Sequence, residues 1–252
     1  MASNSKHSEQ HNIEIHQNLN FWDKKPVLHN IYIRFYKLIS SYINNDLNGL
    51  KVELGSGIGN LKMVVPDVIC TDIFDNPWID QTENAYQLSF KDESVSNIIM
   101  FDVWHHLKYP GNALQEFHRV LQKNGRIIIF EPAMSLLGFI AYGLFHHEPL
   151  GYRKTISWYT DNPKDLHNDE YYAAQSNASK VFCSKKYYTE LKDWNLIKTE
   201  KITSISYILS GGYSKPQLFP SKMLNFLNFL DKICGSIPFL FSTRLLIVLD
   251  KK

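Results

Sequence analysis

The chain has 252 residues, of which 44% are hydrophobic and 21% charged, and this is the composition of a globular protein with a sizeable core. Its 27 Lys and Arg nearly balance its 25 Asp and Glu, with no basic block, so we expect no nucleic-acid partner. The three cysteines (Cys70, Cys183 and Cys234) are scattered, which predicts neither a disulfide framework nor a zinc site and favours a cytoplasmic location.

The first part of the chain divides into a polar and an apolar segment. Residues 1–20 are rich in His, Asn and Ser, so we predict a disordered tail rather than a secretory signal. Residues 21–43 place apolar side chains at helical spacing and predict a helix within an N-terminal cover over residues 21–48. Together with residues 223–241, this helix is expected to cover the acceptor side of the domain.

The middle of the chain alternates between strand and helix patterns. A helix is predicted over residues 111–122, where the apolar positions share one face and Asn124-Gly125 follows as a stop signal. Four runs of β-type residues surround it, at residues 50–54, 68–71, 95–103 and 127–130. This alternation predicts an α/β fold with a parallel, doubly wound sheet.

The second half of the chain is less regular. We predict helices over residues 136–145 and 185–194, and strands over residues 202–209 and 245–249. The apolar stretch that ends at residue 145 is interrupted by Glu131-Pro132, and residues 224–240 are interrupted by two charged residues. Burial in the protein is therefore favoured for both stretches, and peripheral contact with a membrane surface is the alternative.

A glycine-rich segment, Val52-Glu53-Leu54-Gly55-Ser56-Gly57-Ile58-Gly59, follows the first predicted strand. Glycines there let backbone N–H groups approach a ligand at the edge where open α/β sheets bind ligands. A dinucleotide fingerprint needs a sixth-position glycine, and the chain has Asn60 instead. Glu53 would repel a pyrophosphate but suits a ligand that carries an ammonium and a sulfonium. A purely structural turn is the alternative.

Asp72 ends the second predicted strand, thirteen positions after Gly59. An ionised carboxylate accepts two hydrogen bonds at once, which matches the vicinal hydroxyls of a ribose. Its alternative role is to cap a helix or turn.

These motifs resemble the class I S-adenosylmethionine-dependent methyltransferases, in particular the branch of ubiquinone- and menaquinone-biosynthesis enzymes. The resemblance runs in order over residues 51–132. Besides the glycine segment and Asp72, it rests on Asn84-Ala85-Tyr86-Gln87-Leu88-Ser89-Phe90, Val103-Trp104-His105-His106-Leu107, Arg119-Val120-Leu121, Asn124-Gly125-Arg126 and Glu131-Pro132.

The resemblance implies a Rossmann-like, seven-stranded, mostly parallel sheet with an antiparallel last strand and helical insertions. It implies one domain over residues 21–252, with a cofactor half (49–134) and an acceptor half (135–252) that carries insertions at 146–180 and 213–243. The implied cofactor is S-adenosylmethionine, with Glu53 at its methionine end and Asp72 at its ribose. The other residues expected to contact it are Gly55, Ser56, Gly57, Gly59, Ile73, Asn84, Ala85 and Phe101.

Three positions depart from the family pattern. Pro66 leaves room for only a short helix after the glycines, which should shift the second strand but keep the pocket. Asn84 replaces the usual adenine-reading Asp, although its carbonyl can still accept from the adenine amino group. Ser96 stands where an Asp often opens the fourth strand, so an orienting charge is lost.

Histidines are the candidate general bases for an oxygen acceptor, because their pKa lies near neutral pH. His106 is the first choice and forms a pair with His105 that follows the fourth strand; a scaffold role is the alternative for both. His147 with Glu148 is another candidate, with a solvated helix end as the alternative. We expect no metal.

The predicted reaction is methyl transfer to a small molecule, and a hydroxyl of a sugar or cell-surface glycan precursor is ranked first. A prenylated, lipid-like or quinone-type acceptor is the alternative, with peripheral contact to a membrane-borne substrate. A cofactor-binding regulatory protein without catalysis is an alternative of another class.

Overall fold

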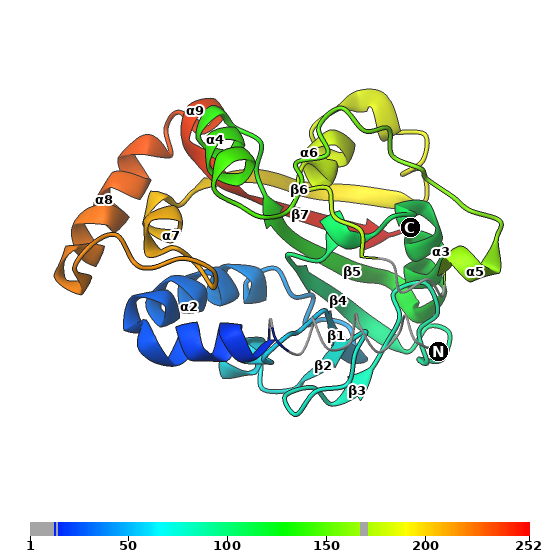
Figure 1. Cartoon of the computed structure of the whole chain (residues 1–252). Coiled ribbons are helices and arrows are strands. Elements are labelled where there is room, and N and C mark those ends of the chain that lie inside the picture. Colours follow the sequence, from blue (N-terminus) through cyan, green and yellow to red (C-terminus); the bar gives the residue numbers. More distant parts are fainter. Residues whose placement is uncertain (1–12, 14, 167–170) are drawn as a thin grey trace.

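The structure of the chain is a computed structural model that describes residues 13, 15–166 and 171–252. Its centre is a seven-stranded sheet with the strand order β3-β2-β1-β4-β5-β7-β6 (Figure 1). The strands are β1 (Leu50–Leu54), β2 (Val68–Asp72), β3 (Gln81–Thr82), β4 (Val95–Phe101), β5 (Leu121–Pro132), β6 (Trp194–Thr203) and β7 (Ser242–Lys251). Strands β1 to β5 run parallel, and β7 is antiparallel to both β5 and β6. The predicted fold class is confirmed.

Helices cover both faces of this sheet (Figure 1). They are α2 (Pro26–Ser40), α3 (Pro110–Val120), α4 (Leu136–Leu144), α5 (Pro163–Leu166), α6 (Asn177–Phe182), α7 (Ile205–Ser210), α8 (Leu224–Cys234) and α9 (Pro238–Phe241). Short 3-10 turns are η1 (Asn60–Met63), η2 (Trp104–His106), η3 (Lys185–Tyr187) and η4 (Ser221–Met223). No helix among the described residues is both long and apolar enough to cross a membrane.

Two hydrophobic layers hold the sheet between the helices, because successive side chains of a strand point to opposite faces. On β4, Ile98 and Met100 face the layer that contains α3, whereas Ile99 faces the layer that contains α2. All three of these side chains are fully buried. Continuous burial of β4 and β5 on both faces explains why their sequences are nearly unbroken apolar runs.

Two predicted elements of the second half are wrong. The predicted helix at 185–194 is only the η3 turn, and β6 begins at Trp194. The predicted strand at 202–209 ends at Thr203, and α7 follows. Strand β6 lies at the sheet edge, where alternate polar residues such as Lys198 and Glu200 remain partly exposed. The position of β6 is set by its pairing with β7, and a local apolar pattern in the sequence does not predict this pairing.

The predicted N-terminal tail is also wrong where the structure describes it. Residues 15–24 form a helix that precedes α2, and Ile15 is buried against the rest of the fold. Residues 1–12 and 14 of that predicted tail lie outside the described residues. A single buried Ile within a polar sequence is too weak an apolar pattern to predict this helix.

Candidate active site

A pocket of about 430 Å³ lies at the carboxyl ends of β1, β2 and β4. This is the edge at which open α/β sheets place their ligands. It brings together nine of the predicted cofactor residues, namely Glu53, Gly55, Ser56, Gly57, Asp72, Ile73, Asn84, Ala85 and Phe101. Gly59 is absent from its lining, as are His105 and His147, whereas His106 and Glu148 are present.

Two glycines of the loop after β1 serve different purposes. Both Gly57 (φ +54°) and Gly59 (φ +66°) have left-handed backbone that disfavours other residues. A Cβ at Gly57 would meet no atom within 4 Å, so the backbone there faces open space in the pocket. A Cβ at Gly59 would lie 2.6 Å from the Trp78 carbonyl oxygen, so Gly59 allows close packing of the chain.

Asp72 connects this loop to the end of β2. Its Oδ2 accepts a hydrogen bond from the Gly57 N–H at 3.0 Å, and its Oδ1 accepts from the Ile73 N–H at 2.7 Å. The side chain is 6% exposed and lines the pocket. Asp72 therefore fixes the loop and also lies in the pocket lining, where its sequence position predicts a carboxylate.

Glu53 is a buried acid in the pocket wall. It is 4% exposed, and the Cys70 thiol donates to its Oε2 at 3.6 Å. Burial raises the pKa of Glu53 to about 8, because the ionised form loses its hydration. A cationic group bound beside it would favour the ionised form, so this site is suited to a positively charged ligand.

Asn84 also lines the pocket, and both ends of its amide are in use. Its Nδ2 donates to the Leu166 carbonyl at 2.9 Å, and its Oδ1 accepts from the Tyr86 N–H at 2.9 Å. Ala85 follows it in the pocket lining. The Asn84 Oδ1 atom, which the sequence analysis expects at the adenine, therefore already stabilises its own loop. A carbonyl oxygen can accept a second hydrogen bond, so this contact leaves Oδ1 able to accept another.

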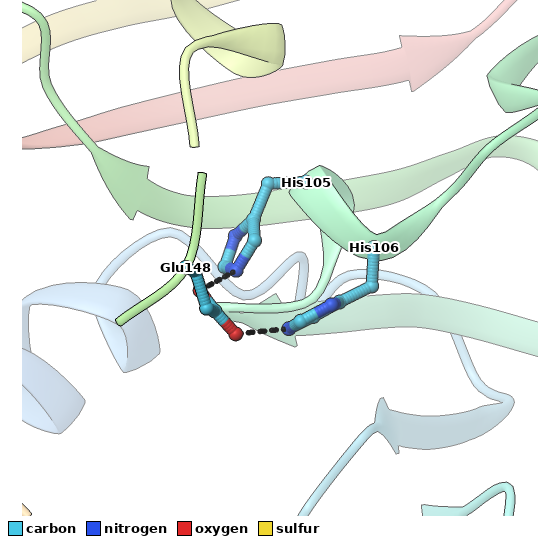
Figure 2. Close-up of side chains that lie close together, drawn as sticks. All are labelled: His105, His106 and Glu148. Atoms are coloured by element: carbon cyan, nitrogen blue, oxygen red, sulfur yellow. Dashed lines mark hydrogen bonds and ion pairs between the residues drawn. The ribbon is translucent and has the colours of Figure 1, made fainter. Parts of the chain in front are cut away.

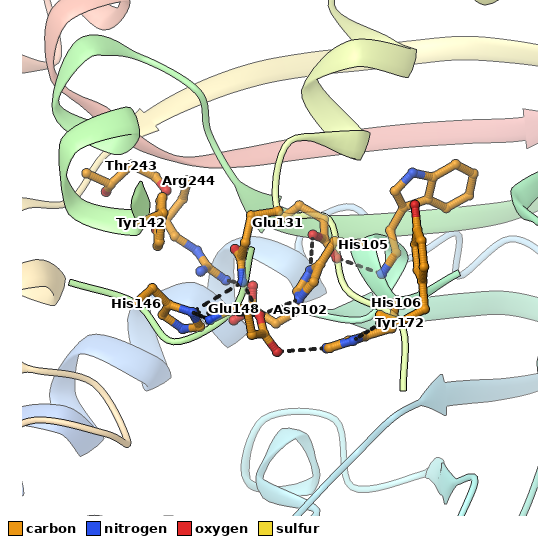
Figure 3. A network of polar contacts seen from close by, with 12 residues as sticks. Asp102, His105, His106, Glu131, Tyr142, His146, Glu148, Tyr172, Thr243 and Arg244 are labelled. Carbon is orange, nitrogen blue, oxygen red and sulfur yellow. Dashed lines mark hydrogen bonds and ion pairs between the residues drawn. The ribbon is translucent and has the colours of Figure 1, made fainter. Parts of the chain in front are cut away.

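His105 is a buried cation rather than a pocket residue. Its Nδ1 lies 2.6 Å from Glu131 Oε2 and its Nε2 lies 3.2 Å from Glu148 Oε2 (Figure 3). Burial alone would lower the pKa of His105, but the two carboxylates raise it to about 10. At neutral pH its ring therefore donates from both nitrogens and holds the two acids in place.

His106 lines the pocket, and its ring, like that of His105, points toward Glu148 (Figure 2). Its Nδ1 lies 2.9 Å from the Tyr172 carbonyl oxygen, which can only accept, so Nδ1 carries the hydrogen. Burial, together with the charge of His105, lowers the pKa of His106 to about 4. The neutral ring thus has its lone pair on Nε2, which lies 3.5 Å from Glu148 Oε1.

Glu148 joins both histidines of η2 but not its sequence neighbour His147. It is held by His105, by the Tyr171 hydroxyl and by the Gln175 amide, which donate to its two oxygens. Burial by itself would raise the pKa of Glu148. The hydrogen bonds and the charge of His105 outweigh burial and hold this pKa well below its usual range. His147 instead stacks on His146 with 4.7 Å between ring centroids, so the structure does not form the predicted dyad.

Asp102 and Arg244 are pocket-side residues that the sequence analysis missed (Figure 3). Asp102 follows β4, lines the pocket and accepts a hydrogen bond from Arg244 Nη2 at 2.8 Å. Arg244 is the one charged residue in the first eight positions of β7, and it is 1% exposed. A lone Arg in an otherwise apolar strand was the signal, because a buried charge requires a partner.

Two groups of side chains place candidate metal-ligand atoms within 4.8 Å of one another: His105, His106 and Glu148, and Asp102, His105 and Glu131. Both groups depend on His105. Because both of its nitrogens face carboxylates and its pKa is raised, His105 has no lone pair to offer at neutral pH. The donor chemistry fits a proton network rather than a metal centre.

Comparison with known proteins places this pocket in a family context. Residues 52–129 match the family described as a methyltransferase domain. No curated protein sequence matches the chain.

Three solved structures illustrate the fold. A Thermotoga maritima methyltransferase, described as a possible histamine N-methyltransferase, has 14% identity and a TM-score of 0.52 over 94% of this chain and 99% of its own. A chain from the complex of the Haloferax volcanii Trm112 methyltransferase activator with its proposed methyltransferase has 12% identity and a TM-score of 0.54 over 95% of each chain. A geranyl diphosphate methyltransferase bound to GPP and sinefungin has 9% identity and a TM-score of 0.51 over 89% of this chain and 79% of its own.

The matched residues contain most of β1 and all of β2 and β4, whose ends form the pocket, together with most of β5. Residues 52–129 thus match a methyltransferase domain, and the solved structures show that the chain as a whole shares the fold of these methyltransferases.

Proposed function

We propose that the enzyme transfers the methyl group to a hydroxyl of a small polar acceptor, a sugar or cell-surface glycan precursor, with His106 as the general base. The observation that carries the proposal is the state of His106: a neutral ring whose unprotonated Nε2 lies in the pocket wall. An alcohol is a poor nucleophile until a base takes its proton, and the cofactor methyl group requires an in-line attack.

The cofactor would lie along the glycine loop. Glu53 would face the ammonium and sulfonium end, because a buried acid at that position gains its charge when a cation binds. Asp72 would accept from the ribose hydroxyls beside Ile73, and Asn84 and Ala85 would lie at the adenine. When bound, this cofactor would supply the methyl group, and its sulfonium would become a neutral thioether.

The acceptor would lie on the His106 side of the same pocket. Nε2 of His106 would take the hydroxyl proton, and the acceptor oxygen would receive the methyl group that the bound cofactor supplies. His105 would act as a positioning residue, since its charge holds Glu148 beside His106. This arrangement keeps His106 neutral in the free enzyme and places a carboxylate beside the imidazolium that forms.

The lining on this side supports a polar, ring-shaped acceptor. Tyr171 and Tyr172 line the pocket, contact His106 and combine ring faces with hydroxyls, which suits stacking against a sugar. A prenylated or quinone-type acceptor is the second candidate, because Tyr32, from α2, adds a further aromatic wall. A regulatory protein without catalysis would bind the cofactor and release it unchanged.

The test begins with labelled S-adenosylmethionine and extracts, to identify the methylated product. With that acceptor, His106→Ala should lower turnover by about 10²–10⁴-fold and leave cofactor affinity nearly unchanged. His147→Ala is the matched control, because His147 lies outside the pocket lining. In the wild type, kcat/KM should fall in acid as pH drops toward about 4, where His106 becomes protonated.

The reverse pattern would contradict the assignment. If His106→Ala lowers cofactor affinity or thermal stability as much as turnover, then His106 is scaffold. If it is neutral in all three measurements, alignment alone carries the reaction. If no methylated product forms although the cofactor binds, the regulatory alternative holds.

A further inference from the structure

Helix α4 presents an apolar face to the outside of the molecule. Its sequence, LLGFIAYGL, has one polar side-chain group, the Tyr142 hydroxyl, which is buried and donates to the Thr243 carbonyl. Helices that are apolar all round are ordinarily buried. Yet Leu136 is 59%, Phe139 45% and Leu144 74% exposed.

Helices α8 and α9 continue this apolar face. On α8, Phe226, Phe229 and Ile233 recur at helical spacing and are each more than half exposed. Only three residues separate α8 from α9, where Phe239 is 65% exposed. Helix α9 contacts α4 and lies beside it at one end of the molecule (Figure 1).

The exposed charges of the segment that contains α8 and α9 have one sign. Between residues 213 and 243 the exposed charged side chains are Lys215, Lys222 and Lys232. The one acid of this segment, Asp231, is buried and lies 3.7 Å from Arg34. The apolar face is therefore bordered by uncompensated cations.

A basic pocket of about 500 Å³ adjoins α4. Tyr152 lies in its lining and contacts Phe139, with 5.8 Å between ring centroids. The lining includes five cations, Arg153, Lys154, Lys180, Lys186 and Lys201, and no acidic residue is among its described members. Lys180 donates from Nζ to the Gly151 and Lys154 carbonyl oxygens at 2.6 and 2.8 Å, and burial and Lys186 lower its pKa. No ion pair with a carboxylate is found for any of the five among the described residues.

One buried group in this pocket also lacks a partner. The Ser176 hydroxyl belongs to a fully buried residue of the lining and has no hydrogen-bond partner among the described residues. A buried hydroxyl without a partner is costly, and a bound acceptor group would satisfy it. Phosphate oxygens accept hydrogen bonds from hydroxyl and ammonium groups alike.

We propose that α4, α8 and α9 with the basic pocket form a surface that binds an anionic lipid bilayer, and that the pocket takes a headgroup phosphate. Apolar and aromatic side chains enter the interfacial layer while flanking Lys and Arg meet anionic headgroups. Phe145, just after α4, is 67% exposed and stands three residues before Glu148 in the acceptor pocket. The bound surface would thus lie beside the acceptor side of the active site.

Vesicle co-sedimentation of the full chain tests this. We expect binding to vesicles of phosphatidylcholine with phosphatidylglycerol and much weaker binding to phosphatidylcholine alone. Phe139→Ser with Leu144→Ser should weaken binding at least about tenfold, because each removes apolar burial. Lys154→Gln with Lys186→Gln should weaken it about fivefold for each cation removed.

Matched controls are Met63→Ser and Lys123→Gln, which change an exposed apolar residue and an exposed lysine outside this surface. All variants should keep the wild-type melting temperature and cofactor affinity. The proposal fails if anionic vesicles do not bind, if neutral vesicles bind equally well, or if the α4 and lysine variants bind as the controls do. Thermal stabilisation by pyrophosphate without vesicle binding would assign the pocket to a soluble phosphorylated ligand instead, and a dimer disrupted by Phe139→Ser would assign the face to a second copy.

Discussion

Arg244 donates from Nη2 to Asp102 Oδ1 at 2.8 Å, which joins the inner strand β7 to the end of β4 at the pocket. The guanidinium is surrounded by aromatic rings, with Phe130 at 4.7 Å and Phe101 at 4.9 Å from its centre. Asp102 has left-handed backbone (φ +58°), which Asp tolerates better than most residues. The pair therefore fixes the turn that leads from β4 to the two histidines.

Removing the anion of this pair should cost more than removing the cation. Arg244 is 1% exposed, so its charge stays buried when Asp102 is replaced, whereas the Asp102 side chain is 30% exposed and can be hydrated after the loss of its partner. We expect Asp102→Asn, which leaves the buried guanidinium without a countercharge, to destabilise the fold by about 3 kcal/mol. Arg244→Met removes the buried charge but also loses its ring contacts and its hydrogen bond, and it should cost about 1–2 kcal/mol. Denaturant unfolding of both variants and their double mutant measures the coupling, and strict additivity would show that the pair is incidental.

Glu53→Gln should stabilise the fold above neutral pH. Burial raises the pKa of Glu53 to about 8 from its ordinary 4.5, so the folded chain resists ionising this acid. Wild-type stability should fall as pH rises from about 4.5 to about 8, whereas the Gln variant lacks this dependence. Melting temperatures should be similar near pH 4.5 and higher for Glu53→Gln near pH 8.5, with exposed Glu93→Gln as the control. Equal melting temperatures of the wild type and Glu53→Gln at both pH values would show that Glu53 ionises freely.

Glu131→Gln should lower the pKa of His105, because it removes one of the two carboxylates that stabilise the protonated ring. Against the effect of burial, Glu131 and Glu148 raise the pKa of His105 to about 10, so the protonated ring stabilises the fold. That contribution is complete below about pH 6.5 and is lost as pH rises through about 10. The variant should lose about 3–5 kcal/mol at neutral pH and show a flatter decline in alkali. The check is to measure the free energy of unfolding of the wild type and of Glu131→Gln at both ends of this pH range. A loss of stability in the variant that does not depend on pH would contradict the prediction.

The parts of the fold that follow from local patterns were predictable. The strands β1, β2, β4 and β5 are apolar runs, and α3 has one apolar face, so the order of elements around the glycine loop could be derived. Glu53 and Asp72 could be placed at one sheet edge because parallel strands end together there.

The remaining features depend on contacts between distant segments. Strand β6 is polar and follows from its pairing with β7, and Ile15 is buried although its surroundings in the sequence are polar. The partner of Glu148 is His105, 43 positions away, rather than the adjacent His147. Tertiary contacts of this kind leave no local period in a sequence.

The most direct test of the account is calorimetric titration of S-adenosylhomocysteine into the wild type and into Asp72→Ala, with Asp72→Asn as an isosteric control. Asp72 holds the Gly57 N–H and presents its carboxylate to the pocket. We predict that the wild type binds this product, that NAD(H) binds far more weakly, and that Asp72→Ala loses about 1.5–3 kcal/mol of binding free energy, with Asp72→Asn between them. NAD(H) binding as tight as that of S-adenosylhomocysteine, or unchanged affinity in Asp72→Ala, would contradict the account.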